Sequence, residues 1–139
     1  MVRVYQFLIG AFALLFLFMG IGFVMNPVQA GGGIGLEAMT PEGMNALRGD
    51  LSGLFLASAG LLIWALVRPN PYYLRAVAVL MLAIAAGRVT GFVTDPLAND
   101  SLIAFVVELV TAAVLLRAAV VPPWRREPIP AAWREATDA

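Results

Sequence analysis

Four long apolar runs, separated by proline, glycine or charged residues, occupy most of this 139-residue chain. The first extends from Val4 to Met25 without a charged side chain, and roughly 20 apolar residues are enough for a helix to cross the hydrocarbon core of a bilayer. With 61% hydrophobic and 13% charged residues, a water-soluble domain of this size could not bury its apolar surface. The sequence therefore predicts an all-α integral membrane protein, folded as a four-helix transmembrane bundle.

The other runs begin and end at recognisable helix signals. The second begins at Thr40-Pro41-Glu42, where Thr40 can cap the helix, Pro41 suits its first turn and Glu42 faces its positive dipole end. Proline steps follow the second, third and fourth runs and end them. The predicted spans are 4–25, 41–67, 72–93 and 101–121, within one transmembrane domain of residues 1–121. Residues 122–139 are Pro-rich and charged, which predicts a polar cytoplasmic tail.

The first run has a competing interpretation as a cleaved signal peptide, because Arg3 precedes it and Val28-Gln29-Ala30 resembles a cleavage site. The run is longer than the usual apolar core of a signal peptide, so we expect it to remain as a span. Asn26-Pro27 and the glycine-rich stretch 31–35 are expected to end this helix and form a loop. That loop is either a flexible connection or a lid over a cavity.

The distribution of charge predicts the orientation. All nine basic residues are Arg, and those near the span ends cluster on one side, opposite the acidic connections. The basic side holds Arg3, Arg68, Arg75, Arg117, Arg125 and Arg126, and the acidic side holds Glu37, Glu42, Asp95 and Asp100. Four aromatic residues are expected to anchor the basic boundary: Trp64, Tyr72, Tyr73 and Trp124. Because basic loops stay in the cytoplasm, both termini are predicted to be cytoplasmic, in a bacterial inner membrane.

Several classes of protein are excluded by composition. The chain has no Cys and no His, which argues against disulfides, thiol chemistry, the usual zinc sites and His-ligated haem. Its formal net charge is zero, and no basic face suits nucleic acid. We therefore expect no metal, no cofactor and no nucleic-acid partner.

Ionisable residues inside the spans are the most informative positions, because charged groups in hydrocarbon usually face a bundle interior or a water-filled cavity. At ~1.5 Å per residue, the charged members of this set reach one level near the outer side of the membrane. The predicted polar cluster consists of Asn45, Arg48, Asp50, Arg88, Glu108 and Thr111. Ser52, four residues after Arg48, is expected on the same helix face. The cluster is either a ligand pocket or an ion-pair network that only fixes the helix packing.

Small residues recur at a spacing of four in two spans, as Gly49-x-x-x-Gly53 and Gly87-x-x-x-Gly91. This spacing lets helix backbones approach each other closely. We expect these faces to pack within one chain, with a homodimer contact as the alternative.

Three blocks together carry a family resemblance: Asn45-x-x-Arg48-Gly49-Asp50-x-x-Gly53, Gly87-Arg88-x-x-Gly91 and Glu108-Leu109. On four short spans, they resemble the uncharacterised bacterial membrane protein family called domain of unknown function 4345, over roughly residues 4–121. One departure is Leu51-Ser52-Gly53, where a second glycine is expected before Gly53. The resemblance implies four helices and importance for these blocks, and it names no reaction.

The residues favour a small multi-pass membrane protein whose outer-leaflet pocket binds a lipid-like or amphipathic molecule. Arg48 and Arg88 would contact an anionic head group through their forked donors, with Asp50 and Glu108 as counter-charges. A catalytic role would use Glu108 or Asp50 as general acid or base, and the sequence leaves open whether the protein is an enzyme. The alternative is an accessory or structural subunit of a larger membrane complex. Membrane lipids are the expected partners, with a second copy or another membrane protein as further candidates.

Overall fold

The computed structural model describes residues 2–36, 40–94 and 99–125. The elements are α1 (Val2–Met25), α2 (Pro27–Gly32), α3 (Pro41–Ala46), the π-helical turn η1 (Leu47–Leu51), α4 (Ser52–Val67), α5 (Pro71–Thr94) and α6 (Asn99–Ala118). Because α3, η1 and α4 continue one another, four helices are long and apolar enough to cross a membrane: Val2–Met25, Pro41–Val67, Pro71–Thr94 and Asn99–Ala118. The predicted all-α, four-helix architecture is confirmed.

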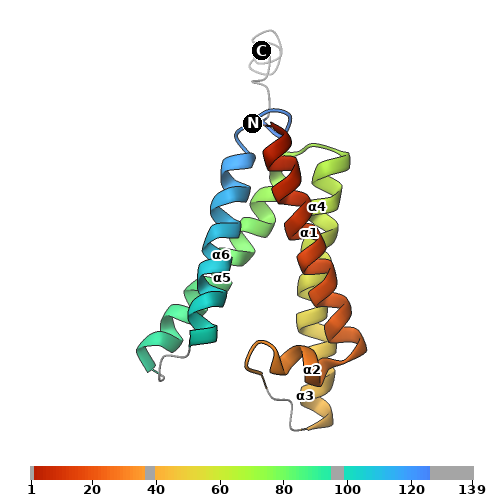
Figure 1. The fold of residues 1–139 in the computed structure, drawn as a ribbon, viewed down its shortest axis with the longest axis vertical. Coiled ribbons are helices and arrows are strands. Elements are labelled where there is room, and N and C mark those ends of the chain that lie inside the picture. The colour runs from red at the N-terminus through yellow and green to blue at the C-terminus, as the bar shows by residue number, and fades with distance from the viewer. Residues whose placement is uncertain (1, 37–39, 95–98, 126–139) are drawn as a thin grey trace, which may run out of the picture.

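The four long helices form two antiparallel pairs, α1 with α4 and α5 with α6, which have the most extensive contacts in the described chain. The two pairs meet at one end and separate toward the other (Figure 1). We call the meeting end, with the start of α1, the α4–α5 connection and residues 118–125, the closed end. The opposite end, with α2, α3, the end of α5 and the start of α6, is the open end (Figure 1).

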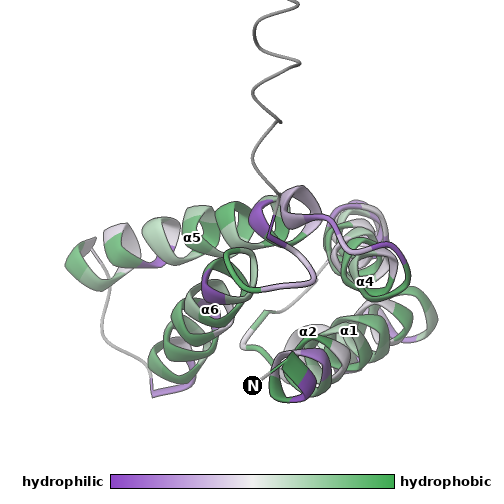
Figure 2. Cartoon of the chain, turned by 90° about the horizontal axis from the view of Figure 1, so that it is seen from above, coloured by the Kyte–Doolittle hydropathy of each residue, from purple (hydrophilic) through white to green (hydrophobic). Residues whose placement is uncertain are grey.

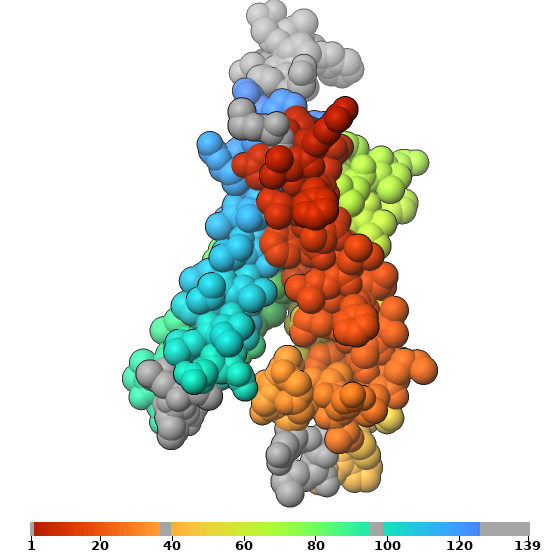
Figure 3. Space-filling model, viewed as in Figure 1, coloured from red at the N-terminus to blue at the C-terminus, as the bar shows by residue number. Residues whose placement is uncertain are grey.

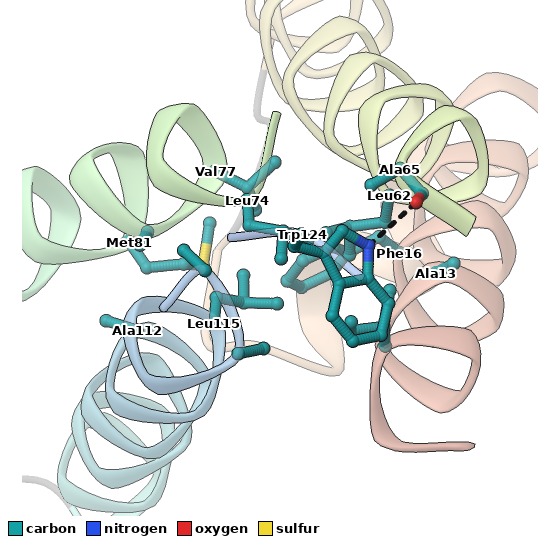
Figure 4. Close-up of a cluster of buried hydrophobic side chains, with 14 of the residues drawn as sticks. Ala13, Phe16, Leu62, Ala65, Leu74, Val77, Met81, Ala112, Leu115 and Trp124 are labelled. Carbon is teal, nitrogen blue, oxygen red and sulfur yellow. Dashed lines mark hydrogen bonds between the residues drawn. The ribbon is translucent and has the colours of Figure 1, made fainter. Parts of the chain in front are cut away.

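Buried residues recur every three or four positions along each helix, as expected for helices that pack through one stripe. In α1 the stripe is Ile9, Ala13, Phe16, Gly20 and Phe23. In α5 it contains Leu74, Val77, Ala78, Met81 and Ala85, and in α6 Glu108, Thr111, Ala112, Leu115 and Ala118. Most of their apolar members, Phe23 and Ala85 excepted, gather toward the closed end into one core (Figure 4). Since α1 supplies part of this core, the first run is an integral helix of the fold.

The outward faces of the helices are apolar as well. Phe7, Phe18 and Val93 are at least 75% exposed, and hydrophobic positions predominate along the helices in the view from above (Figure 2). A helix that is apolar on all sides is unfavourable in water and suits a hydrocarbon environment. The surface therefore agrees with the length and composition of the spans.

The close approach of α1 and α4 occurs at Gly20, which the sequence analysis did not single out. A Cβ atom on Gly20 would lie 2.7 Å from Cγ of Leu56 and 3.1 Å from its backbone nitrogen. Next to this contact, Phe55 of α4 packs against Phe16 and Phe23 of α1, with ring centroids 5.9 and 5.8 Å apart. The absence of a side chain at Gly20 therefore lets α4 approach α1 closely at Leu56.

The first connection contains a helix where a glycine-rich loop was expected. Asn26 caps α2 by accepting a hydrogen bond from the backbone of Gln29, and Pro27 occupies its first turn. Gly31 fits because a Cβ there would lie 2.9 Å from the Leu36 carbonyl oxygen. Gly35 ends the turn at φ 76°, a conformation that favours glycine. Residues 37–39, including Glu37, lie outside the described residues.

The expectation that Trp124 anchors the basic boundary of the membrane is wrong. Its side chain is 1% exposed and belongs to the closed-end core, so it is not an interfacial anchor (Figure 4). Its Nε1 donates to the carbonyl oxygen of Ala65 at 2.8 Å. Ala65 lies in the last turn of α4, where carbonyl groups lack partners within the helix. The folded unit therefore extends beyond residue 121 to Trp124, and residues 126–139 of the predicted tail lie outside the described part.

Trp64 and Tyr72 fit the expected boundary, whereas Tyr73 is partly buried against the core. Trp64 and Tyr72 are each 50% exposed. The Arg68 guanidinium lies 5.7 Å from the Trp64 ring centroid, and that of Arg75 lies 6.0 Å from the Tyr72 ring. Amphipathic rings beside basic groups are typical of a membrane–water interface.

Candidate functional site

An ion pair joins the last two helices toward the open end. Arg88 of α5 donates from Nε to Oε1 of Glu108 of α6 at 2.7 Å. The two residues continue the buried stripes of their helices, one turn beyond Ala85 in α5 and one turn before Thr111 and Ala112 in α6. Because α5 and α6 are antiparallel, this places the pair in the layer that follows the apolar core. The predicted contact between Arg88 and Glu108 is present in the structure, and Thr111 lies one helical turn from Glu108 on α6.

The pair leaves several polar atoms without partners. The Arg88 side chain is 28% exposed and that of Glu108 is 10% exposed. Arg88 uses only Nε in the described structure, although a guanidinium has five N–H donors. Oε2 of Glu108 and Oγ1 of Thr111 are buried, and neither atom has a hydrogen-bond partner within the described residues. A buried polar group without a hydrogen bond lowers the stability of the fold by about 1–3 kcal/mol. The arrangement therefore suits an additional polar group that would supply the missing hydrogen bonds.

Arg48 and Asp50 lie on the other helix pair. Both are exposed on η1, whose extensive contacts are with α1 to α4, and neither has an ion-pair partner in the part of the chain that is described. Asn45 is exposed on α3 beside them. Asn45, Arg48 and Asp50 therefore lie on a different helix pair from Arg88 and Glu108, and the described structure does not join the two groups.

The π-helical turn changes which residues share a face. Ser52 is 4% exposed while Arg48 is exposed, so the expectation that both lie on one face is wrong. The physical reason is the wider turn of a π-helix, in which hydrogen bonds join residues five apart instead of four. Ser52 instead donates from Oγ to the Arg48 carbonyl oxygen. Single π turns inside α-helices occur frequently at functional sites.

The glycines of the two predicted packing faces do not pack inside the chain. A Cβ atom on Gly49, Gly53 or Gly87 would meet nothing within 4 Å, and all three residues are exposed. Gly91 is partly buried on α5. The expected intrachain packing of the first three is therefore wrong, because α1 packs on the opposite side of α4 and α6 on another side of α5. Their role in a homodimer stays a prediction.

A cavity lies between the end of α1 and α2, beside the glycine-rich stretch for which a lid over a cavity was one of the two expectations. It has a volume of about 450 Å³ and is lined mainly by apolar side chains, with the amides of Asn26 and Gln29 at its edge. The apolar lining includes Phe18, Met19, Phe23, Met25 and Ile34. Its signal in the sequence was the Asn26-Pro27 step, which starts the helix α2 that forms one wall.

Within residues 2–36, 40–94 and 99–125, no three acidic side chains lie close enough together to hold a metal ion. Asp95, one of the residues of the acidic side, lies outside the described residues.

Two antiparallel helix pairs of membrane-spanning length, with one ion pair between the last two helices, define a small all-α protein of the four-helix class. The chain belongs to the family described as domain of unknown function (DUF4345), which matches residues 4–119. The resemblance carried by the three motif blocks is thereby confirmed. No curated protein and no solved structure matches the chain.

Proposed function

We propose that this is a multi-pass membrane protein whose open end binds the head group of an anionic amphiphile, with Arg88 as the anion contact. The observation that carries this proposal is the one-point contact of Arg88 with Glu108. Its Nε is held at 2.7 Å, while its two terminal nitrogens have no hydrogen-bond partner among the described residues. A phosphate or carboxylate matches those free donors.

The geometry of the pair favours a binding role over a purely structural one. A structural Arg–carboxylate pair commonly uses two parallel hydrogen bonds, which fix both side chains. Here the acidic member is fixed in the helix contact and the basic member is the more exposed of the two. Glu108 therefore orients Arg88 and keeps its charge compensated, and Arg88 keeps donors available.

The surroundings favour an amphiphile over a small soluble ion. The two helix pairs separate at the open end and leave a hollow between them (Figure 3). Apolar side chains are exposed on the helices beside the pair, including Val89, Val106 and Leu109. A lipid-like molecule would place its chain against such surfaces and its head group at the Arg88 level.

We also propose that the closed end faces the cytoplasm of a bacterium, with the protein in its inner membrane. Arg3, Arg68, Arg75, Arg117 and Arg125 all belong to the closed end, which agrees with the charge rule for membrane orientation. Both termini would then be cytoplasmic, and the Arg88–Glu108 pair would lie in the outer leaflet.

A second candidate function, an accessory or structural subunit of a membrane complex, is supported by a different observation. Gly49 of η1 and Gly53 of α4 present an uncovered backbone surface, and such surfaces are typical of helix–helix contacts in membranes. The two functions are compatible, because the uncovered face and the ion pair lie on different helix pairs.

The test uses the full chain purified in a mild detergent and native mass spectrometry with added lipid. We expect phosphatidylglycerol, which is anionic, to be retained in preference to zwitterionic phosphatidylcholine, and Arg88→Gln to lose that preference. Arg75→Gln, at an exposed Arg of the same helix, is the matched control and should behave like the wild type. Equal retention of both lipids by the wild type, or unchanged preference in Arg88→Gln, would refute the proposed site.

A further inference from the structure

We propose that the outer face of α4 is the interface of a homodimer in which Arg48 of each copy pairs with Asp50 of the other. This interface does not depend on the amphiphile site, because it uses η1 and α4 instead of α5 and α6. The inference rests on the exposed charges of η1, the uncovered backbone beside them and the symmetry that relates two copies in one membrane.

We use the name outer face of α4 for a surface that starts at Gly49 of η1 and continues along α4 with Gly53, Ala57 and Gly60. These residues follow one another at helical spacing and are all exposed. A Cβ atom on any of the three glycines would meet nothing within 4 Å. The buried residues of the same helix, such as Leu62, lie on the side that packs against α1 and α5. A second helix could therefore approach the backbone of α4 closely along this face.

The π turn places one charge on each side of Gly49. In an unbroken α-helix, Arg48 would point in nearly the same direction as Ser52, four residues later, which is buried. In η1 the wider turn moves Arg48 out to the surface, beside Gly49, and Asp50 follows on the other side. Successive residues of an α-helix are separated by about 100° around the axis, and by less in a π turn. Both side chains therefore flank the uncovered backbone.

A twofold axis then determines which charges meet. Copies inserted the same way up in a membrane are related by an axis along its normal, and most homodimers have this symmetry. Gly49 of each copy lies at the contact. Seen along the twofold axis, Arg48 lies on one rotational side of Gly49, for example clockwise, and Asp50 lies on the other. The rotation preserves this sense, so it is the same in both copies. The clockwise side of one helix faces the anticlockwise side of its partner. Each Arg48 consequently faces an Asp50, and like charges are kept apart.

The same charges explain why a second copy fits better than an unrelated protein. Arg48 and Asp50 have no ion-pair partner among the residues that the structure describes, although they belong to a span of membrane length. Unpaired charges at such positions are costly. The face carries one cation and one anion in a self-complementary arrangement, so a copy of itself satisfies both at once. A different partner would need its own matched pair at the same spacing.

The charges allow a test by exchange. The full chain is purified in mild detergent, and its mass is measured by native mass spectrometry for the wild type, Arg48→Asp, Asp50→Arg and the double variant. We expect dimers for the wild type and the double variant, and at least a tenfold lower dimer fraction for each single variant, where two like-charged pairs would form. A monomeric wild type, or single variants that dimerise like the wild type, would overturn the proposal.

Co-expression of the two single variants with different tags provides the decisive measurement. Arg48→Asp carries two acidic residues at the contact and Asp50→Arg carries two basic ones, so they should form a heterodimer while neither forms a homodimer. Recovery also shows that each variant folds and inserts. If the heterodimer does not appear, the charges do not meet across an interface and the proposal fails.

Two glycine variants locate the contact. Gly53→Leu should abolish the dimer because the side chain would fill the approach path of the second helix, whereas Gly87→Leu should leave it intact, since Gly87 lies on α5. The opposite result would place the interface on α5 and overturn the proposal, as would a stoichiometric partner of a different mass bound in place of the second copy. Arg88→Gln should remain dimeric, which separates this inference from the amphiphile site.

Discussion

Arg88 and Glu108 are joined by a single hydrogen bond of 2.7 Å, one turn beyond the last apolar layer shared by α5 and α6. Glu108 is the more buried partner and Arg88 the more exposed one. The carboxylate is therefore held by the helix contact, and the guanidinium extends from it toward less occupied space. This asymmetry is the basis for treating the pair as a binding element with a structural component.

The structural component predicts a non-additive stability effect. Arg88→Gln and Glu108→Gln should each destabilise the protein by about 1–3 kcal/mol, less than the ~3–5 of a fully buried pair because Arg88 keeps part of its side chain exposed. Each change leaves the other charge without its partner. The double variant should lose less than the sum of the two single losses.

Thermal unfolding of these three variants and the wild type in one detergent provides the measurement. Arg75→Gln, an exposed Arg on α5 with a Tyr72 ring contact, controls for loss of charge and should change the free energy of unfolding by less than about 1 kcal/mol. If the stability losses of the two single variants simply add in the double variant, Arg88 and Glu108 do not interact in the detergent-solubilised protein.

Gly20 is predicted to be the least replaceable glycine of the first helix. Gly20→Ala should destabilise the protein by about 1–3 kcal/mol, because the added Cβ would lie 3.1 Å from the backbone nitrogen of Leu56 as well as against its side chain. Gly22→Ala, whose nearest neighbour would be 3.8 Å away, should be nearly neutral. Equal melting temperatures for the two variants would show that α1 and α4 can separate without cost.

The sequence was sufficient to predict the helices because their signals are local. An uncharged run such as 4–25 has one stable solution in a bilayer, and the Thr40-Pro41 step determines where the second span begins, as its cap confirms. The Arg88–Glu108 contact was also predictable, since depth along two antiparallel neighbouring helices can be counted. Both inferences depend on spacing within a helix or between adjacent helices.

Other features depend on which helix lies beside which face, and spacing does not contain that information. Gly49 and Gly87 have the same local pattern as a packed glycine, yet α1 packs at its own Gly20 against the opposite side of α4. The π turn that turns Arg48 outward has no distinct sequence signal. Trp124 was assigned to the interface by its position, whereas the chain reverses after α6 and places it against Ala65.

Trp124 is expected to stabilise the closed end through both its volume and its N–H group. Trp124→Phe should lower the free energy of unfolding by about 1–3 kcal/mol, because it removes buried volume and leaves the Ala65 carbonyl oxygen without its partner. Trp64→Phe alters a half-exposed ring and serves as the control. Thermal unfolding distinguishes them, and comparable effects would indicate that Trp124 does not pack in the core.

The proposed orientation predicts a cytoplasmic carboxyl terminus. A reporter that is active only in the cytoplasm, fused after Ala139, should be active, and one that is active only in the periplasm should be silent. The physical reason is the arginine cluster at the closed end. Reporters inserted after Pro96, in the α5–α6 connection, should give the reverse pattern. Activity of the periplasmic reporter at Ala139 would reverse the topology and move the ion pair to the inner leaflet.

Thr111 separates the binding role of the polar site from its structural role. Its Oγ1 is buried without a hydrogen-bond partner in the described chain, one turn from Glu108, whose Oε2 is in the same state. Thr111→Val keeps the shape and removes the unsatisfied hydroxyl, so the protein should be as stable as the wild type or slightly more stable.

The same variant should retain less phosphatidylglycerol if the hydroxyl and the Glu108 oxygen take part in holding a bound head group. Ser58→Ala is the matched control, because Ser58 Oγ is equally buried and unpartnered on α4 but lies outside the α5–α6 site. Thermal unfolding and lipid retention are measured on both variants. If both variants are as stable as the wild type and only Thr111→Val retains less lipid, the Thr111 hydroxyl belongs to the binding site. A clear loss of stability in Thr111→Val would show that the hydroxyl serves the fold.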